Sequence, residues 1–141
     1  MPQETSKKVK PQQTLSEKIN TYSILYIEDN ISNLKIVEAI ITKRMKQLFI
    51  CANTGGLGIE MALAHKPDII LLDLRLPGLD GYAVKEIINK EPSLSGIPII
   101  ALSANAMSEE IERVKESGFQ EFISKPIDIP SFISSLNQYL E

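Results

Sequence analysis

The fold is decided by residues 68–81, which read Asp-Ile-Ile-Leu-Leu-Asp-Leu-Arg-Leu-Pro-Gly-Leu-Asp-Gly. Four apolar residues, 69–72, stand between Pro67 and a Pro-Gly break, which predicts a strand buried on both faces at the centre of a parallel sheet. Asp73 ends this strand. Taken alone, an Asp there more often starts a turn or caps a helix. Sites in open α/β sheets nevertheless lie just beyond the carboxyl ends of the strands, so Asp73 is also well placed for chemistry.

The composition is that of an ordinary globular domain. The 141 residues are 43% hydrophobic and 23% charged, which suits one domain with a core and some tail. A formal net charge of -3 gives no electrostatic footprint for nucleic acid or an anionic membrane. The chain has no apolar run long enough to span a membrane, and residues 1–20 lack the hydrophobic stretch of a signal peptide. We therefore expect a cytoplasmic protein with no direct nucleic-acid binding and no membrane insertion.

A single cysteine and a single histidine limit the chemistry further. Cys51 follows Ile50 in an apolar run and is expected to be a small buried side chain rather than a nucleophile. His65 lies near a helix end and is expected at the solvated surface. Zinc sites and Cys/His catalytic pairs are therefore not expected.

Residues 1–21 differ from the rest of the chain, because lysine, proline and glutamine outnumber apolar residues there; we expect a flexible tail followed by one domain over 22–141. The expected strands are 23–27, 47–51, 69–72, 97–102 and 121–124, and the expected helices are 31–45, 54–65, 82–90, 108–117 and from 129 onward. Right-handed crossovers then predict an α/β fold, a doubly wound five-stranded parallel sheet in the order 2-1-3-4-5 flanked by five helices.

Helical periodicity predicts which side chains face inward. These are Leu57, Met61 and Ala64 in the second helix, Val84, Ile87 and Ile88 in the third, and Ile129, Phe132, Ile133, Leu136 and Leu140 in the fifth. Glycines at 55, 56 and 58 weaken the prediction of the second helix, because each disfavours a helix interior by about 1 kcal/mol. They do not form a phosphate loop, because the Gly-Lys-Ser or Gly-Lys-Thr ending of such a loop is missing. Asn30 or Ser32 is expected to cap the first helix, Ser108 the fourth, and Gly118 to end the fourth in a left-handed conformation.

Polar side chains follow the expected strands at one edge of the sheet. The first and third strands are neighbours in the predicted order, so Glu28, Asp29 and Asp73 converge, while Ser103 and Lys125 arrive from the fourth and fifth strands. Three carboxylates within a few Å repel one another unless a cation lies between them. Oxygen ligands without histidine or cysteine indicate a hard ion such as Mg2+.

The same groups are suited to holding a phosphoryl group. The metal and Lys125 would neutralise its equatorial oxygens, and Ser103 would donate a hydrogen bond. Asp73 would then be the nucleophile and form an acyl phosphate.

Residues 22–141 resemble the receiver domains of two-component response regulators. The resemblance rests on Glu28-Asp29-Asn30, on Asp73 followed by Leu76-Pro77-Gly78 and Asp80-Gly81, on Ala101-Leu102-Ser103-Ala104, and on Phe119 through Phe122 to Lys125-Pro126. It implies that a sensor histidine kinase or a phosphotransfer protein supplies the phosphoryl group to Asp73. It also implies that Mg2+ is held by Asp29, Asp73 and the backbone carbonyl of Arg75, with Glu28 helping through water.

The resemblance also implies a switching mechanism. Ser103 matches the hydroxyl switch residue and Phe122 the aromatic one, and the Lys125-Pro126 peptide is expected to be cis. Because Phe122 lacks a hydroxyl, its switching must rely on packing. The signal is expected to reach a downstream protein partner through the face made by residues 108–117, 121–124 and the last helix, which is also the surface expected for any homodimer. Arg75 and Asn105 match a variable pair that tunes the lifetime of the phosphoryl group.

This phosphorylated signalling switch would be no enzyme beyond its own phosphotransfer and autodephosphorylation. Two other functions are alternatives to it. A phosphatase of the haloacid dehalogenase type also uses an Asp after a parallel strand, but it needs a second Asp where this chain has Arg75. A docking module that never takes phosphate would be indicated by loss of an acid or of the lysine, and none is lost. Whether the chain is a stand-alone regulator or a receiver cut from a hybrid kinase stays open.

Overall fold

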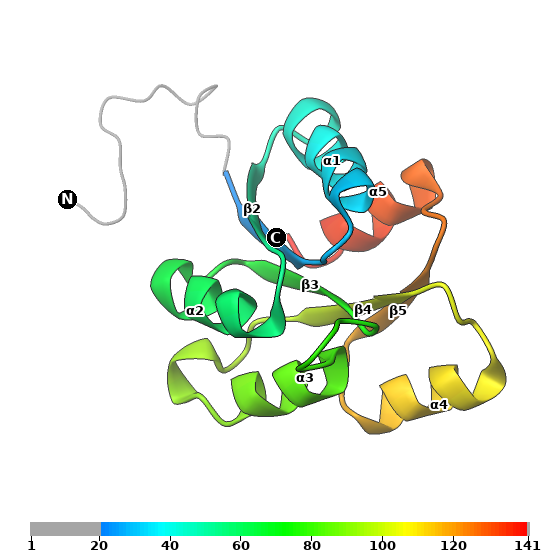
Figure 1. Ribbon diagram of the computed structural model, residues 1–141. Helices are drawn as coiled ribbons and strands as arrows, with labels where there is room; N and C mark the ends of the chain where they lie inside the picture. The colour runs from blue at the N-terminus through cyan, green and yellow to red at the C-terminus, as the bar shows by residue number, and fades with distance from the viewer. Residues whose placement is uncertain (1–20, 141) are drawn as a thin grey trace.

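The computed structural model describes residues 21–140, and the flexible tail expected at 1–21 falls almost wholly outside the described residues (Figure 1). Strands and helices alternate along the chain. They are β1 (Ser23–Ile27), α1 (Ile31–Ala39), η2 (Ile40–Arg44), β2 (Leu48–Ala52), α2 (Gly55–His65), β3 (Ile69–Asp73), α3 (Gly81–Asn89), η3 (Pro92–Leu94), β4 (Ile99–Ser103), α4 (Ser108–Glu116), β5 (Glu121–Ser124) and α5 (Ile129–Asn137).

The five strands form one sheet in the order β2-β1-β3-β4-β5, and every paired neighbour is parallel, as predicted. All residues of β3 are buried, which confirms its place at the centre of the sheet. Helices α1 and α5 cover one face, and α2, α3 and α4 cover the other (Figure 1). The sheet therefore delivers the carboxyl ends of β1, β3, β4 and β5 to a common edge.

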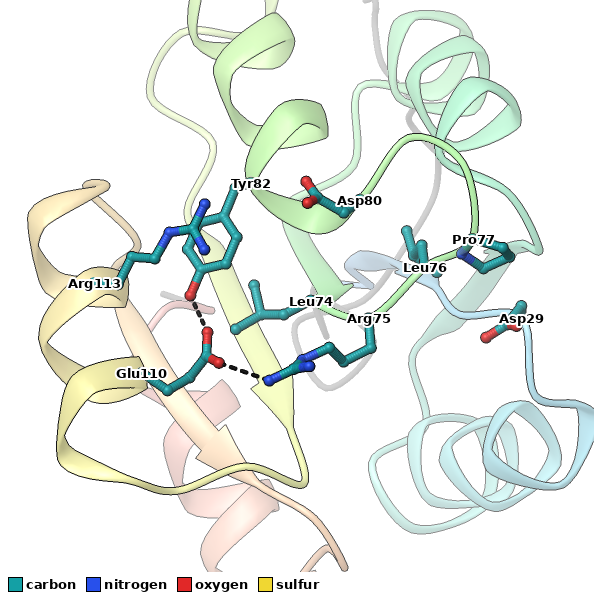
Figure 2. A pocket seen from close by; sticks show the side chains of 9 residues that line it. All are labelled: Asp29, Leu74, Arg75, Leu76, Pro77, Asp80, Tyr82, Glu110 and Arg113. Carbon is teal, nitrogen blue, oxygen red and sulfur yellow. Dashed lines mark hydrogen bonds and ion pairs between the residues drawn. The ribbon is translucent and has the colours of Figure 1, made fainter.

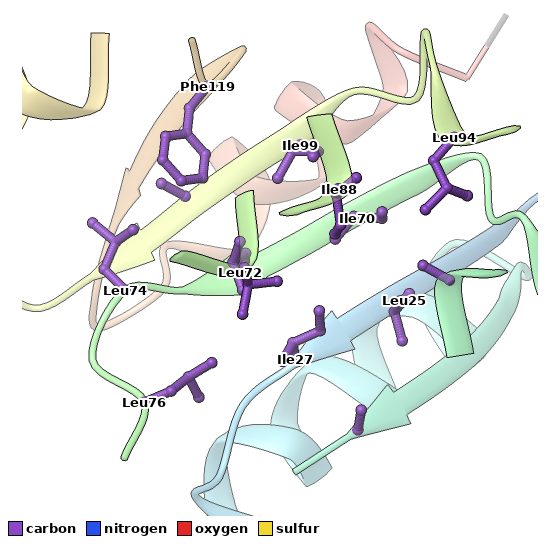
Figure 3. Packing of buried hydrophobic residues seen from close by; sticks show 14 of the residues in the cluster. Leu25, Ile27, Ile70, Leu72, Leu74, Leu76, Ile88, Leu94, Ile99 and Phe119 are labelled. Carbon is purple, nitrogen blue, oxygen red and sulfur yellow. The ribbon is translucent and has the colours of Figure 1, made fainter. Parts of the chain in front are cut away.

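Alternate residues of each central strand pack into two separate cores. Ile70 and Leu72 of β3 contribute to the core under α2, α3 and α4, which Figure 3 shows, while Ile69 and Leu71 pack under α1 and α5. Burying one such side chain contributes about 2 kcal/mol. These cores hold the strand ends in place, which fixes the positions of the polar residues that follow them.

The inward face of α2 is not the predicted one. Gly55 and Gly58 are buried, whereas Leu57 and Ala64 are exposed and Met61 is partly buried. A Cβ atom at Gly58 would lie 2.7 Å from Cγ1 of Ile27, so α2 packs on β1 with no room for a side chain there unless Ile27 shifts. Gly58, one of the glycines that weakened the helix prediction, is the residue that allows this packing on β1.

Several smaller expectations were also wrong. Cys51 is exposed because β2 is an edge strand with only its last residue buried. Ile87 is 43% exposed, since Val84 and Ile88, one turn apart, form the buried stripe of α3. Ser108 does not cap α4; Met107 holds that position without a side-chain hydrogen bond, and two glutamates in the first turn face the positive end of the helix dipole.

Other local expectations were confirmed. Asn30 caps α1 by accepting from the backbone N–H of Asn33, and Gly118 has φ +86 after α4. His65 is exposed, and the α5 stripe packs into the core as predicted. The expected first helix continues beyond α1 as the π turn η2, where Met45 N–H donates to the carbonyl of Ile40. Within residues 21–140, none of the helices has the length and apolar character needed to cross a membrane.

Candidate functional site

Three carboxylates meet where β1 and β3 end. Ile27 pairs with Leu72 in the register, so Glu28 and Asp73 follow side by side, and Asp29 comes next in the chain. One oxygen from each of the three carboxylates lies within 4.8 Å of the others. Glu28 and Asp73 are buried, at 1% and 3% exposure, while Asp29 is exposed. The predicted convergence of these acids is therefore observed.

Lys125 brings a positive charge to the same place from the end of β5. Its Nζ atom lies 2.9 Å from Oε1 of Glu28 and 3.3 Å from Oδ2 of Asp73. Its backbone N–H donates to the carbonyl of Ser103, and the Lys125-Pro126 peptide is cis, as expected. The ammonium thus bridges two of the three carboxylates.

Glu28 is held by further donors that sequence reasoning missed. The hydroxyl of Tyr26 donates to Oε1 at 2.8 Å, and the side-chain amide of Asn33 donates to the same atom at 3.2 Å. The backbone N–H of Asn30 donates to Oε2 at 3.1 Å. Tyr26 could have been found from the period of two along β1, which places it on the same face as Glu28. These bonds fix Glu28 as an acceptor that stays charged.

The pKa values of the two buried carboxylates, Glu28 and Asp73, are shifted in opposite directions. Burial, together with the neighbouring Glu28, raises the pKa of Asp73 to about 6. Burial alone would also raise the pKa of Glu28, but hydrogen bonds from Asp73, Lys125, Tyr26 and Asn30 lower it to about 2. Although burial alone would lower the pKa of Lys125, Glu28 and Asp73 raise it, so the lysine stays charged. Without a bound metal ion, Asp73 is therefore the carboxylate that takes up a proton first, while Glu28 stays charged.

Ser103 ends β4 next to this cluster. It is fully buried, and its Oγ accepts a hydrogen bond from the backbone N–H of Asn105 at 3.0 Å. The backbone N–H of Leu74 donates to the carbonyl of Leu102, so the two chain segments that leave β3 and β4 lie against each other. The predicted hydroxyl thus lies beside the strand that carries Asp73.

Arg75 lies between the carboxylates and α4. Its backbone N–H donates to Oδ1 of Asp73 at 3.2 Å, and its Nη2 atom lies 3.0 Å from Oε1 of Glu110. Figure 2 shows the Arg75 side chain reaching across to Glu110, whose other oxygen accepts from the hydroxyl of Tyr82. An open hollow of about 530 Å³ borders these side chains and extends to Asp29. Sequence reasoning missed Glu110 and Tyr82, because no local pattern links positions 35 and 28 residues apart.

Phe122, the predicted aromatic switch, is partly buried. It packs against the core under α2, α3 and α4, in the strand that borders α4. Part of the ring is therefore already removed from water, and rotating it inward would bury only the remainder.

Comparisons with known proteins agree with this geometry. The family described as the response regulator receiver domain matches residues 24–137. The polar-differentiation response regulator DivK of Brucella ovis is 35% identical over 120 residues, which is 85% of this chain and 97% of DivK.

Solved structures share the fold. The receiver domain of a sensor histidine kinase from Pseudomonas aeruginosa PAO1, with magnesium ion coordinated in its active site cleft, has a TM-score of 0.78 at 29% identity; the match covers 85% of this chain and 98% of that one. A response regulator structure from Chloroflexus aurantiacus has a TM-score of 0.80 at 20% identity, covers 86% of this chain and 98% of that one, and supports the fold alone.

The fold, the carboxylate cluster and these matches define the class of protein: the chain belongs to the response regulator receiver family. It is a phosphorylatable receiver domain of the type found in two-component signalling. The matches give no support to the alternative of a haloacid dehalogenase phosphatase, and Arg75 stands where that alternative needs an Asp.

Proposed function

We propose that Asp73 is the residue that accepts the phosphoryl group, and that the donor is a phosphohistidine of a sensor histidine kinase or phosphotransfer protein. A carboxylate oxygen of Asp73 bonds to phosphorus while the P–N bond to the imidazole breaks. The electron pair of that bond goes to the imidazole nitrogen. The observation that carries this proposal is the buried Asp73 beside Lys125 at 3.3 Å, at the carboxyl end of the central strand.

The surrounding residues supply charge and hydrogen bonds for the transferred group. Lys125 lies where its ammonium can neutralise a phosphoryl oxygen, as cationic side chains do in phosphoryl-transfer sites. Ser103 is placed to donate its hydroxyl to another oxygen, because its strand neighbours that of Asp73. Neither Lys125 nor Ser103 forms a covalent bond to the phosphoryl group.

The donor set fits Mg2+. Glu28, Asp29 and Asp73 offer only oxygen atoms, within 4.8 Å of one another, and hard divalent cations favour such ligands. Asp29, Asp73 and the backbone carbonyl of Arg75 would hold the ion, and Glu28 would help through water. When bound, the ion supplies positive charge that offsets the phosphoryl oxygens. The residues themselves position the nucleophile.

The output of the switch is proposed to be a change in protein binding. A phosphoryl oxygen on Asp73 attracts the hydroxyl of Ser103 and moves the loop 104–107 that leads into α4. Phe122 then moves inward beside α4, and a downstream partner or a second copy reads the face formed by α4, β5 and α5. The site would carry out no reaction on other molecules and would only take up and lose its own phosphoryl group. We expect the protein to act in the cytoplasm.

Phosphorylation of the purified chain tests this proposal. With acetyl phosphate and Mg2+, the intact mass should increase by one phosphoryl group in the parent protein. Asp73→Asn, which keeps the shape and removes the nucleophile, should show no increase. Asp80→Asn is the matched control, because Asp80 caps α3 and lies outside the carboxylate cluster, and this variant should be modified like the parent. A modified Asp73→Asn protein would contradict the assignment.

A further inference from the structure

Glu110 of α4 accepts hydrogen bonds from three side chains on three different segments. Arg75 of the β3–α3 loop donates to Oε1 at 3.0 Å, and Asn105 of the β4–α4 loop donates to the same oxygen at 3.2 Å. Tyr82 of α3 donates its hydroxyl to Oε2, and Figure 2 shows Arg113 lying along the Tyr82 ring. The side chain of Glu110 is only 9% exposed. This one carboxylate therefore ties α4 to α3 and to both loops.

The ties made by Glu110 lead directly to the phosphorylation site. Arg75 also donates its backbone N–H to Oδ1 of Asp73, at 3.2 Å. Asn105 also donates its backbone N–H to Oγ of Ser103, at 3.0 Å. The side chains next to the nucleophile and next to the hydroxyl thus share one acceptor in the unphosphorylated protein.

A phosphoryl group on Asp73 is a strong competitor for Arg75. It carries nearly two negative charges and three acceptor oxygens, and the planar guanidinium of arginine binds phosphate in a bidentate manner. Arg75 begins two residues after Asp73, and its side chain is 62% exposed in the pair with Glu110. Because the guanidinium is mostly in water, screening weakens its attraction to Glu110, so Arg75 can exchange one anion for another.

We propose that Glu110 is a positioning residue: it holds the Arg75 guanidinium on α4 in the unphosphorylated protein, and the phosphoryl group on Asp73 competes for that guanidinium. This inference rests on the proposed function, because it needs the phosphoryl group on Asp73. When Arg75 leaves, α4 keeps its ties to Tyr82 and Asn105 and loses its tie to the β3–α3 loop. Arg75 thereby links the charge on Asp73 to the position of α4.

Binding of beryllofluoride, which imitates a phosphoryl group on a carboxylate, tests this competition in the presence of Mg2+. Glu110→Gln keeps the size of the side chain and an oxygen that accepts from Tyr82, but it no longer holds a guanidinium by charge. The freed Arg75 should lower the apparent Kd for beryllofluoride about two- to fivefold, the range of one partly exposed ion pair. Glu109→Gln is the matched control: it is the exposed neighbour on α4, loses the same charge, and should bind like the parent.

The dependence on Arg75 separates positioning from a merely structural role. In an Arg75→Met background, Glu110→Gln should leave the Kd unchanged, whereas a general loss of packing would weaken binding in both backgrounds. The inference is overturned if Glu110→Gln still lowers the Kd for beryllofluoride in the Arg75→Met background. It is also overturned if Glu110→Gln and Glu109→Gln bind beryllofluoride with the same Kd. In either case the parent still binds beryllofluoride and the proposed function stands. A parent that binds none overturns the proposed function itself.

A measurement on the parent protein needs no variant. The NMR signal of the Arg75 side-chain Nε–H should shift on adding beryllofluoride, because its anionic partner changes. The signal of Arg44, which lies in the π turn after α1, should stay in place. The proposed exchange is overturned if backbone signals around Asp73 shift and the Arg75 side-chain signal does not.

Discussion

The ammonium of Lys125 lies 2.9 Å from a carboxylate oxygen of Glu28, a residue 97 positions earlier in the chain. This ion pair connects the end of β5 to the end of β1 across β3 and β4, and the lysine side chain is only 16% exposed. Removing the cation beside a buried carboxylate destabilises the folded protein more than removing one at the surface, because water cannot screen the buried charge. We therefore expect the pair to stabilise the fold, in addition to the role proposed for Lys125 in phosphoryl transfer.

Replacing Lys125 by methionine should lower the free energy of unfolding by about 3 kcal/mol without metal, because Glu28 and Asp73 then share a buried site without compensation. Urea unfolding measures this value. Lys90→Met is the matched control, since Lys90 forms an exposed pair with Glu86 at 3.8 Å; its cost should be below about 1 kcal/mol. Equal costs for the two variants would contradict the role of Lys125.

Gly58→Ala should destabilise the protein by about 1 to 3 kcal/mol, because the new Cβ would overlap Ile27 at the contact of α2 with β1. Gly56→Ala, two residues earlier in the same helix, adds a Cβ with nothing within 4 Å. It should stabilise by up to about 1 kcal/mol through helix propensity. Thermal unfolding of both variants checks the opposite signs, and a stabilised Gly58→Ala protein would contradict the close packing.

The stability of the metal-free protein should fall as the pH rises from about 4 to about 6. Burial and Glu28 raise the pKa of Asp73 to about 6 in the folded protein, above the value of 3.8 for an unperturbed Asp. The folded state then holds this proton more tightly, so its contribution is complete below pH 4 and is lost as the pH passes 6. Glu28 acts in the opposite direction: its pKa falls from 4.5 to about 2 on folding, so its contribution grows as the pH passes 4.5 and offsets part of the loss from Asp73.

Urea unfolding in EDTA at several pH values measures this slope. Asp73 should contribute a loss of about 2 kcal/mol between pH 4 and pH 6, and Asp73→Asn should remove this loss because the amide does not titrate. A slope that survives in Asp73→Asn would assign the effect to another group.

Millimolar Mg2+ should raise the melting temperature of the parent, since an ion that binds only the native state stabilises it in proportion to the logarithm of its concentration. Asp29→Ala removes one of the three carboxylates and should abolish this dependence. Chelation by EDTA should reverse the gain. Melting curves that coincide with and without Mg2+ would show that the acids do not form a metal site.

Much of the fold could be predicted because each buried strand reads as a short apolar run between turn residues, and because alternation of strands and helices restricts the sheet to few orders. The convergence of Glu28, Asp29 and Asp73 followed from that order alone. What could not be predicted depends on neighbours that the local pattern does not contain. Gly58 looks unfavourable in a helix until Ile27 is known to lie against it.

The same limit explains the misplaced and missing residues. Cys51 follows an apolar residue, but its strand lies at the edge of the sheet, where neighbouring elements cover less of the chain. Glu110 resembles any first-turn glutamate, and its partners Arg75 and Tyr82 are distant in the sequence. Local patterns thus predicted the carboxylate cluster around Asp73, whereas the connection from that cluster to α4 required the structure.

The most direct test of the central claim is chemical location of the phosphoryl group. An acyl phosphate is reduced by borohydride, which converts the aspartyl side chain into an alcohol. After treatment with acetyl phosphate and Mg2+, borohydride reduction and proteolysis, peptide mass spectrometry should find the reduced residue at position 73. Unreduced Asp73 together with a reduced carboxyl at Glu28, Asp29 or elsewhere would contradict the account.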